Sequence, residues 1–270
     1  MRRKIQLKDK LGRTLKHLRV PKRATLIIIS LLVLIVAVIC LILWSMQTWS
    51  QYSDNYNQHY NNIKTEIDSV IKQATPNKTN TELITKLNRI IQAQNKIKDE
   101  INPFCDVTTF VRWQSFVQQY LDKIKDCEYK KGHLNQLIDD LGILTAYLGA
   151  EQRLAAVISS ANEKTIQNNQ SNKWELIEQF WRQAIIDTSK LPNTTEFKPI
   201  KTLASKGLIS VADAWKQLVI ANEAKNRQNF EKAKTDLNSA YTLLSSIGDS
   251  SKAWAEKLVT NFNDSYKKAF

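Results

Sequence analysis

Few residues of the sequence have the types and spacing that catalysis or metal binding requires. His59 and His133 have no serine, cysteine or carboxylate at a diagnostic motif spacing. Asp139 and Asp140 are adjacent on a predicted helix, where neighbouring side chains do not face one another. No glycine-rich phosphate loop occurs among the 6 glycines. The sequence therefore predicts no catalytic, cofactor-binding or metal site. The protein is expected not to be an enzyme, and an envelope hydrolase is the enzymatic alternative.

The cysteines offer one candidate for chemistry, a disulfide between Cys105 and Cys127. One straight helix would separate these residues by about 33 Å, whereas a disulfide needs Cα atoms about 5–6 Å apart. A bond therefore requires residues 105–112 to fold back along the helix that follows. The alternative is a pair of buried thiols. Cys40 lies in an apolar run and is expected to be a small buried hydrophobic residue.

Most of the positive charge lies at the start of the chain. The 270 residues carry a formal net charge of +13, but residues 1–24 contain ten Lys or Arg and a single acid, Asp9. The rest of the chain is close to neutral, so we expect no nucleic-acid partner. Residues 1–24 are predicted to be a basic cytoplasmic tail that fixes orientation. Alternatively, this tail lies along anionic lipid headgroups.

A long uncharged run follows the basic tail. Residues 24–53 contain no charged side chain, and residues 26–44 are apolar except for Ser30 and Cys40. A helix of about 20 residues spans about 30 Å, the thickness of a bilayer's hydrocarbon core. We predict a transmembrane helix over residues 25–46. It is expected to be an uncleaved signal anchor, because the apolar run is longer than the apolar segment of a signal peptide and no A-x-A-like cleavage site follows it.

The charge asymmetry predicts the topology of the chain. Basic residues stay on the cytoplasmic side of a span, so the N-terminus is expected in the cytoplasm and the C-terminal domain outside it, at the cell membrane. Trp and Tyr are enriched at both membrane interfaces, so those that follow the span are expected at the outer one. The residues predicted at the two membrane interfaces are Arg19, Lys22 and Arg23 on the inner side, and Trp44, Trp49 and Tyr52 on the outer side.

Residues 47–103 are predicted to form a helical hairpin stalk. Apolar residues recur there in alternating steps of four and three, which is the spacing of a coiled-coil seam. Two seams of equal length, joined by a short turn, favour an antiparallel pair, and self-association is the alternative. Gln94 interrupts the second seam, where it either fixes register or faces solvent. The seam positions are Tyr56, Tyr60, Ile63, Ile67, Val70 and Ala74, then Leu83, Leu87, Ile90, Ile97 and Ile101.

The remaining residues are predicted to form an extracytoplasmic helical bundle, which makes the fold class all-α. A helical region over 104–163 holds either two helices, 107–131 and 134–163, or one long bent helix. Lys130, Lys131 and Gly132 have the pattern of a helix end. The polar segment 164–173 is expected to be a linker. The C-terminal bundle, 172–270, is expected to contain helices over 174–188, 208–226, 228–247 and 250–268, with a loop over 189–199.

One stretch near the C-terminus resembles a single unit of a tetratricopeptide repeat, which covers about 34 residues. The resemblance rests on the run Q-N-F-E-K-A-K-x-x-L-x-x-A, with Gln228 in place of the usual Gly and Ser245 near the usual Pro. It implies a groove that binds a peptide or protein, and ordinary packing through small residues is the alternative. The residues that carry it are Ala221, Ala224, Phe230, Ala233, Leu237 and Ala240.

Four N-x-[ST] sequons occur, at Asn77, Asn169, Asn193 and Asn263, and all are expected in loops or near an end. In a eukaryotic secretory compartment they could carry glycans, whereas in a typical bacterium most would go unused.

These features together predict a single-pass membrane-anchored envelope or cell-surface protein whose helical ectodomain binds or scaffolds another protein without catalysis. The expected partners are the lipid bilayer and either another envelope protein or a second copy. The alternative is a sensor or an accessory subunit of a membrane signalling or transport complex.

Overall fold

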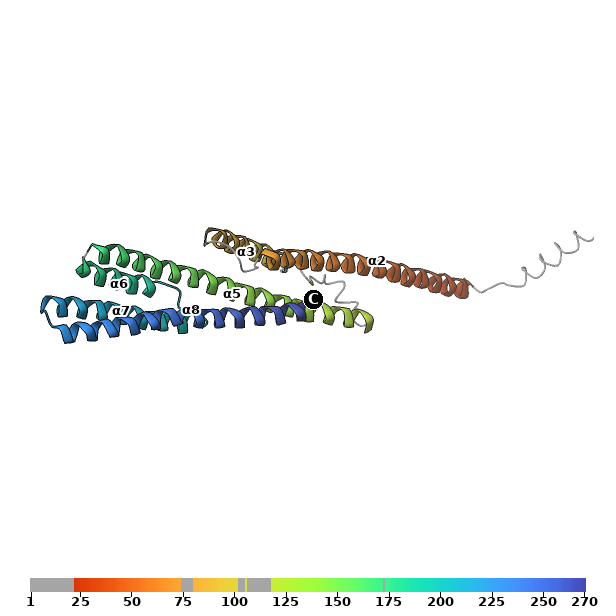
Figure 1. The fold of residues 1–270 in the computed structure, drawn as a ribbon. Helices are drawn as coiled ribbons and strands as arrows, with labels where there is room; N and C mark the ends of the chain where they lie inside the picture. Colours follow the sequence, from red (N-terminus) through yellow and green to blue (C-terminus); the bar gives the residue numbers. More distant parts are fainter. Residues whose placement is uncertain (1–21, 74–79, 102–104, 106–117, 172) are drawn as a thin grey trace, which may run out of the picture. The chain divides into compact units, whose positions relative to one another are not determined.

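A computed structural model describes residues 22–73, 80–101, 105, 118–171 and 173–270 of the chain. These residues contain helices and no strand, which confirms the predicted all-α fold. Figure 1 shows the helices, which are α2 (Lys22–Gln73), α3 (Asn80–Ile101), α5 (Gln118–Gln170), α6 (Trp174–Ser189), α7 (Lys198–Glu223) and α8 (Arg227–Ala269).

The described residues divide into two compact units. The first holds residues 22–57 and 118–122, and the second holds 58–73, 80–101, 105, 123–171 and 173–270. The first unit consists mainly of the apolar part of α2. The second contains the buried core.

Helices α5 and α8 run antiparallel in the second unit. The Tyr147 hydroxyl donates a 2.9 Å hydrogen bond to the Ser251 carbonyl, and Ser265 donates a 2.5 Å bond to Asp140 Oδ2. The α8 partner thus moves toward the C-terminus as the α5 partner moves toward the N-terminus. Helices α6 and α7 add the large buried side chains Trp181, Leu208 and Trp215, and the buried Phe197 directly precedes α7.

The connections around α7 are short and locally explained. Pro199 lies in the first turn of α7, where its fixed φ is compatible with the helix and its missing N–H costs no bond. After α7, Lys225 has a φ of 51°, and the Asn226 side chain accepts a 3.0 Å hydrogen bond from the Asn229 N–H to cap α8. This tight turn returns the chain along α7.

Residues 58–73 and α3 also belong to the second unit. The seam residues that the structure buries are Ile63, Ile67 and Val70 on α2, and Leu87, Ile90, Ile97 and Ile101 on α3. The half-buried Gln94 faces α5, because a Cβ added at Gly142 would lie 2.6 Å from Gln94 Nε2. Lys96 of α3 forms an ion pair with Glu66 of α2.

Four predicted helix boundaries differ from those in the structure, and the first is the one at Gly132. Helix α5 continues past Gly132, where an added Cβ would meet nothing within 4 Å. An interior glycine costs a helix only about 1 kcal/mol, and the buried Leu134, Leu137 and Ile138 anchor the next turns. The one-helix alternative is therefore the one observed over Gln118–Gln170, while residues 107–117 lie outside the described residues.

The polar segment 164–173, expected to be a linker, is helical through Gln170. Its Thr165 is buried and donates a 2.8 Å hydrogen bond to the Ala161 carbonyl, so a single buried position holds the otherwise polar turns. One core cluster contains Leu154 and Ala161 together with residues of α6, α7 and α8. Residues on both sides of the expected linker thus share a core.

The C-terminal bundle contains fewer and longer helices than expected. Helix α7 begins at Lys198, ten residues before the predicted start at 208, because Ile200 and Ala204 are buried. Helix α8 continues through the expected break between 247 and 250, where Ile247 and Ser251 are both buried. The predicted loop over 189–199 agrees with the end of α6 at Ser189.

Candidate functional site

The first candidate site is the apolar part of α2. The large apolar side chains from Ile29 to Met46 are exposed on every side of the helix. A helix that packs one face against a protein core has polar residues on its other face. A helix that is hydrophobic all round is instead typical of a deeply buried position or of a lipid bilayer. Among the described residues, one helix is long and apolar enough to cross a membrane.

The predicted interface residues lie at the two ends of this apolar part. Lys22 and Arg23 begin α2, and Arg19 lies outside the described residues. Trp44 is exposed, and the rings of Trp49 and Tyr52 lie 5.1 Å apart on the next turns. The contact of these residues with membrane interfaces stays a prediction.

The structure contains a disulfide between Cys105 and Cys127, whose Cα atoms are 5.8 Å apart. Cys127 is buried on α5, and Cys105 follows α3 with a φ of 61°. The bond thus ties the chain beyond α3 to α5, and the alternative of two free thiols is not observed. The fold-back expected over 105–112 lies, apart from Cys105, outside the described residues. Cys40 was expected to be buried, but it is exposed, and no other described residue covers it.

The titratable residues considered for catalysis lie on α2 and α5. His59 is half-buried on α2, and His133 packs edge-on against Tyr129 with ring centroids 4.3 Å apart. Asp140 accepts the hydrogen bond from Ser265, whereas Asp139 is exposed. No three His, Cys, Asp or Glu side chains of the described residues gather where a metal ion would fit.

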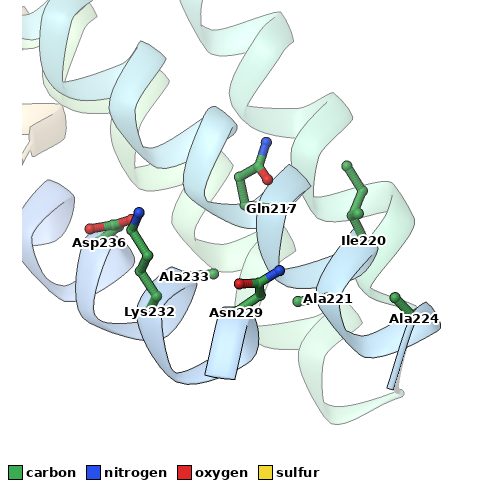
Figure 2. A pocket seen from close by; sticks show the side chains of 8 residues that line it. All are labelled: Gln217, Ile220, Ala221, Ala224, Asn229, Lys232, Ala233 and Asp236. Atoms are coloured by element: carbon green, nitrogen blue, oxygen red, sulfur yellow. The ribbon is translucent and has the colours of Figure 1, made fainter. Parts of the chain in front are cut away.

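The second candidate site is a groove of about 290 Å³ between the last turns of α7 and the first turns of α8. Ala221 and Ala233 are buried at its floor, and Ile220 is 47% exposed beside them. Figure 2 shows the side chains of both helices around this groove. Its polar residues are Gln217 from α7 and Asn229, Lys232 and Asp236 from α8.

The groove can make hydrogen bonds but lacks the features of a catalytic site. A carboxamide offers both a donor and an acceptor, so Gln217 and Asn229 match the groups of a peptide backbone. Lys232 and Asp236 add one charge of each sign. The alanine floor leaves room for small side chains, and Ile220 offers the one large apolar contact. These residue types suit binding to another polypeptide.

Three of the repeat-like residues, Ala221, Ala224 and Ala233, line the groove. Ala233 also belongs to the core cluster, as do Leu237 and Ala240, and Phe230 stacks on Trp174 with ring centroids 6.1 Å apart. Helix packing therefore accounts for the buried members of the pattern, including two of the residues that line the groove. The sequence reasoning missed Gln217, Ile220, Asn229, Lys232 and Asp236, although their spacing on each helix, in steps of three and four, was a usable signal.

A second hollow, of about 270 Å³, lies on the other side of the last turns of α7. It is lined by Trp174 and Glu175 at the start of α6 and by Val219, Asn222 and Glu223 of α7. Trp174 also contacts the ring of Trp215, with centroids 6.5 Å apart. The last turns of α7 therefore have a hollow on each of two sides.

Comparison of the chain with models of protein families, with curated proteins and with solved structures found no match.

Proposed function

We propose that this chain is a single-pass, signal-anchored protein of the cell membrane whose helical bundle lies outside the cytoplasm and binds another protein. The observation that carries the proposal is the apolar helix from Ile29 to Met46, which is exposed on every side. In water such a surface would favour aggregation, and a bilayer removes that cost. A predicted basic tail precedes this helix.

The disulfide supports the same topology by an independent route. The charge rule places the chain after the span outside the cytoplasm. Disulfides persist in oxidising compartments and are rare in the cytosol. The bond between Cys105 and Cys127 belongs to the part that follows the span. Charge and redox chemistry therefore favour one orientation.

The groove between α7 and α8 is the proposed contact with a partner. Its carboxamides and opposite charges can bind a polypeptide, and Ile220 gives it an apolar anchor. The partner is another envelope protein or a second copy of this chain. The proposal includes a stalk over residues 47–103 that pairs as a hairpin and links the span to the bundle.

A sensor or accessory subunit is the second candidate. One feature favours it: α2 is a single helix over Lys22–Gln73, so the candidate span and the Asp68 carboxylate that binds Tyr266 belong to one element. A displacement of that element could pass to a separate transmembrane subunit. Co-purification of the chain with a kinase or channel subunit would favour this function.

The topology is tested by adding protease to intact spheroplasts. The bundle should be digested from outside without lysis. Digestion only after lysis would exclude the proposed orientation.

The binding site is tested with a photo-crosslinking amino acid at Ile220, in the groove, and at Ile186, on α6. The two positions are matched, because both are isoleucines and their side chains are 47% and 50% exposed. We expect an adduct from position 220 and none from 186. An adduct at twice the chain's mass indicates self-association, and another mass indicates a different protein. Equal labelling from the two positions, or none, would contradict a partner in the groove.

A further inference from the structure

We infer that Asn193 is the acceptor of an N-linked glycan when the bundle enters a compartment that holds a lipid-linked oligosaccharide donor. The inference rests on the topology of the proposed function. Asn193, Asn169 and Asn263 are the sequons within the described residues, and Asn77 lies outside them. The structure gives these three sequons very different surroundings.

The sequon at Asn263 lies within α8 (Arg227–Ala269). Its hydroxyl residue, Ser265, is buried and donates a 2.5 Å hydrogen bond to Asp140 Oδ2. A transferase must read both the asparagine and this hydroxyl. Reaching them here would require the end of α8 to leave α5, so Asn263 is a poor acceptor.

The sequon at Asn169 lies in the last turn of α5, which ends at Gln170. Its hydroxyl residue, Ser171, donates a 3.1 Å hydrogen bond to the Gln167 carbonyl. The neighbouring Asn168 carbonyl accepts a 2.8 Å bond from the Lys173 N–H. This sequon is therefore exposed, but its hydroxyl and the neighbouring backbone are engaged in the hydrogen bonds that end the helix.

The sequon at Asn193 lies in the loop between α6 and α7, with no regular structure at Asn193 itself. Asn193 and the sequon's Thr195 are both exposed. No described residue forms a hydrogen bond with the Thr195 hydroxyl. The side chain and the hydroxyl that a transferase must read are both accessible there.

The ends of this loop are fixed although its middle is exposed. Leu191 and Phe197 are buried on either side of Asn193. Lys201 Nζ donates hydrogen bonds to the Ser189 and Leu191 carbonyls, at 2.9 and 2.6 Å. Because Asn193 itself is exposed, a glycan there does not require these anchors to leave the core, so folding of the core and modification are compatible.

The transfer forms one bond and breaks one. The Asn193 side-chain nitrogen attacks the anomeric carbon of the oligosaccharide, and a C–N bond forms there. The C–O bond to the lipid pyrophosphate breaks, and the pyrophosphate leaves with the electron pair. The amide nitrogen gives its proton to a base of the transferase, and nothing is oxidised or reduced.

The test uses the full chain carrying Asn77→Gln, translated in the presence of endoplasmic-reticulum microsomes. We expect one slower band that a glycan-removing amidase converts to the unmodified mobility. Asn193→Gln and Thr195→Ala should each abolish this band, and Thr195→Ser should retain it. Asn169→Gln and Asn263→Gln are the matched controls and should retain it.

Protease protection in the same microsomes separates the two hypotheses. If the bundle is protected but no slower band forms, or the band survives Asn193→Gln, the inference is wrong and the topology stands. If the bundle is digested from outside, the proposed topology fails and the inference fails with it.

Discussion

The Tyr266 phenol donates a 2.5 Å hydrogen bond to Asp68 Oδ1, which joins the last turn of α8 to α2. The preceding residue, Ser265, donates to Asp140 on α5 at the same distance. Tyr60 of α2 also donates a 3.1 Å bond to the Ala269 carbonyl. Consecutive residues of α8 thus bind carboxylates on two different helices, so this end of the second unit is specified by polar side chains as well as by burial.

Alkaline pH should weaken this junction. The hydrogen bond to the Asp68 carboxylate, with further burial, raises the pKa of Tyr266 to about 12 from an ordinary value of 10.0. Because the folded-state pKa is the higher one, the contribution of Tyr266 is complete below pH 10 and is lost as pH rises toward 12. Tyr266→Phe should lower the free energy of unfolding by about 1–2 kcal/mol at pH 8.

Urea denaturation of the full chain in detergent micelles measures this effect. The difference between wild type and Tyr266→Phe should shrink from pH 10 upward, and Tyr129→Phe, at an exposed tyrosine, is the control. A difference that stays constant up to pH 12 would show that the hydrogen bond to Asp68 does not stabilise the fold.

A buried polar network should be sensitive to the loss of one partner and tolerant of the loss of both. Tyr147 is fully buried, its hydroxyl donates to the Ser251 carbonyl, and Ser251 Oγ donates a 2.6 Å bond to Glu151 Oε1. Burial raises the pKa of Tyr147, so the hydroxyl stays protonated. Ser251→Ala leaves part of this network unpaired and should cost about 1–3 kcal/mol.

The matched control is Ser245→Ala, an exposed serine on the same helix, which should change stability by less than about 0.5 kcal/mol. The double variant Tyr147→Phe with Ser251→Ala should cost less than the sum of the two single changes. Both are read from urea midpoints, and strict additivity would mean that the two residues do not act as a pair.

The sequence was a good guide wherever burial follows helical spacing. The middle of the first predicted seam, from Ile63 to Val70, and the second seam from Leu87 to Ile101 contain buried apolar residues, because a helix with one apolar stripe must cover it. The uncharged run was equally informative, since its length and lack of charge suffice to predict the long exposed helix. For Cys105 and Cys127 the sequence left a disulfide and two buried thiols both open, and the structure contains the disulfide.

Helix ends were the part that the sequence could not specify. Gly132 and the polar residues 164–170 look like terminators, yet both lie inside α5. The reason is tertiary: buried neighbours such as Leu134 and Thr165 outweigh a local preference of about 1 kcal/mol. The groove was missed for a similar reason, since its residues come from two helices whose pairing the sequence alone does not give.

Removal of the disulfide should destabilise the second unit without changing its helix content. Cys105 and Cys127 are 22 residues apart, and closing a loop of this size restricts the unfolded chain by about 3 kcal/mol. The double variant Cys105→Ser with Cys127→Ser should lose about that much in urea denaturation. Cys40→Ser is the control, because Cys40 is exposed and unbonded. An unchanged urea midpoint in the double variant would mean that the bond is not formed in the isolated protein.

Two interior glycines differ in the space around them, so substitution should destabilise the chain at one and stabilise it at the other. Gly207 of α7 is buried, and a Cβ there would lie 2.8 Å from Leu244 Cδ2 and 3.3 Å from its Cγ. Gly207→Leu should therefore force α7 and α8 apart and cost more than about 2 kcal/mol. Gly149 of α5 has open space around its Cβ position. Gly149→Ala should stabilise the chain by about 0.5–1 kcal/mol through reduced freedom of the unfolded state. Thermal denaturation of the full chain checks both signs, and a Gly207→Leu variant as stable as wild type would show that α7 and α8 do not approach this closely.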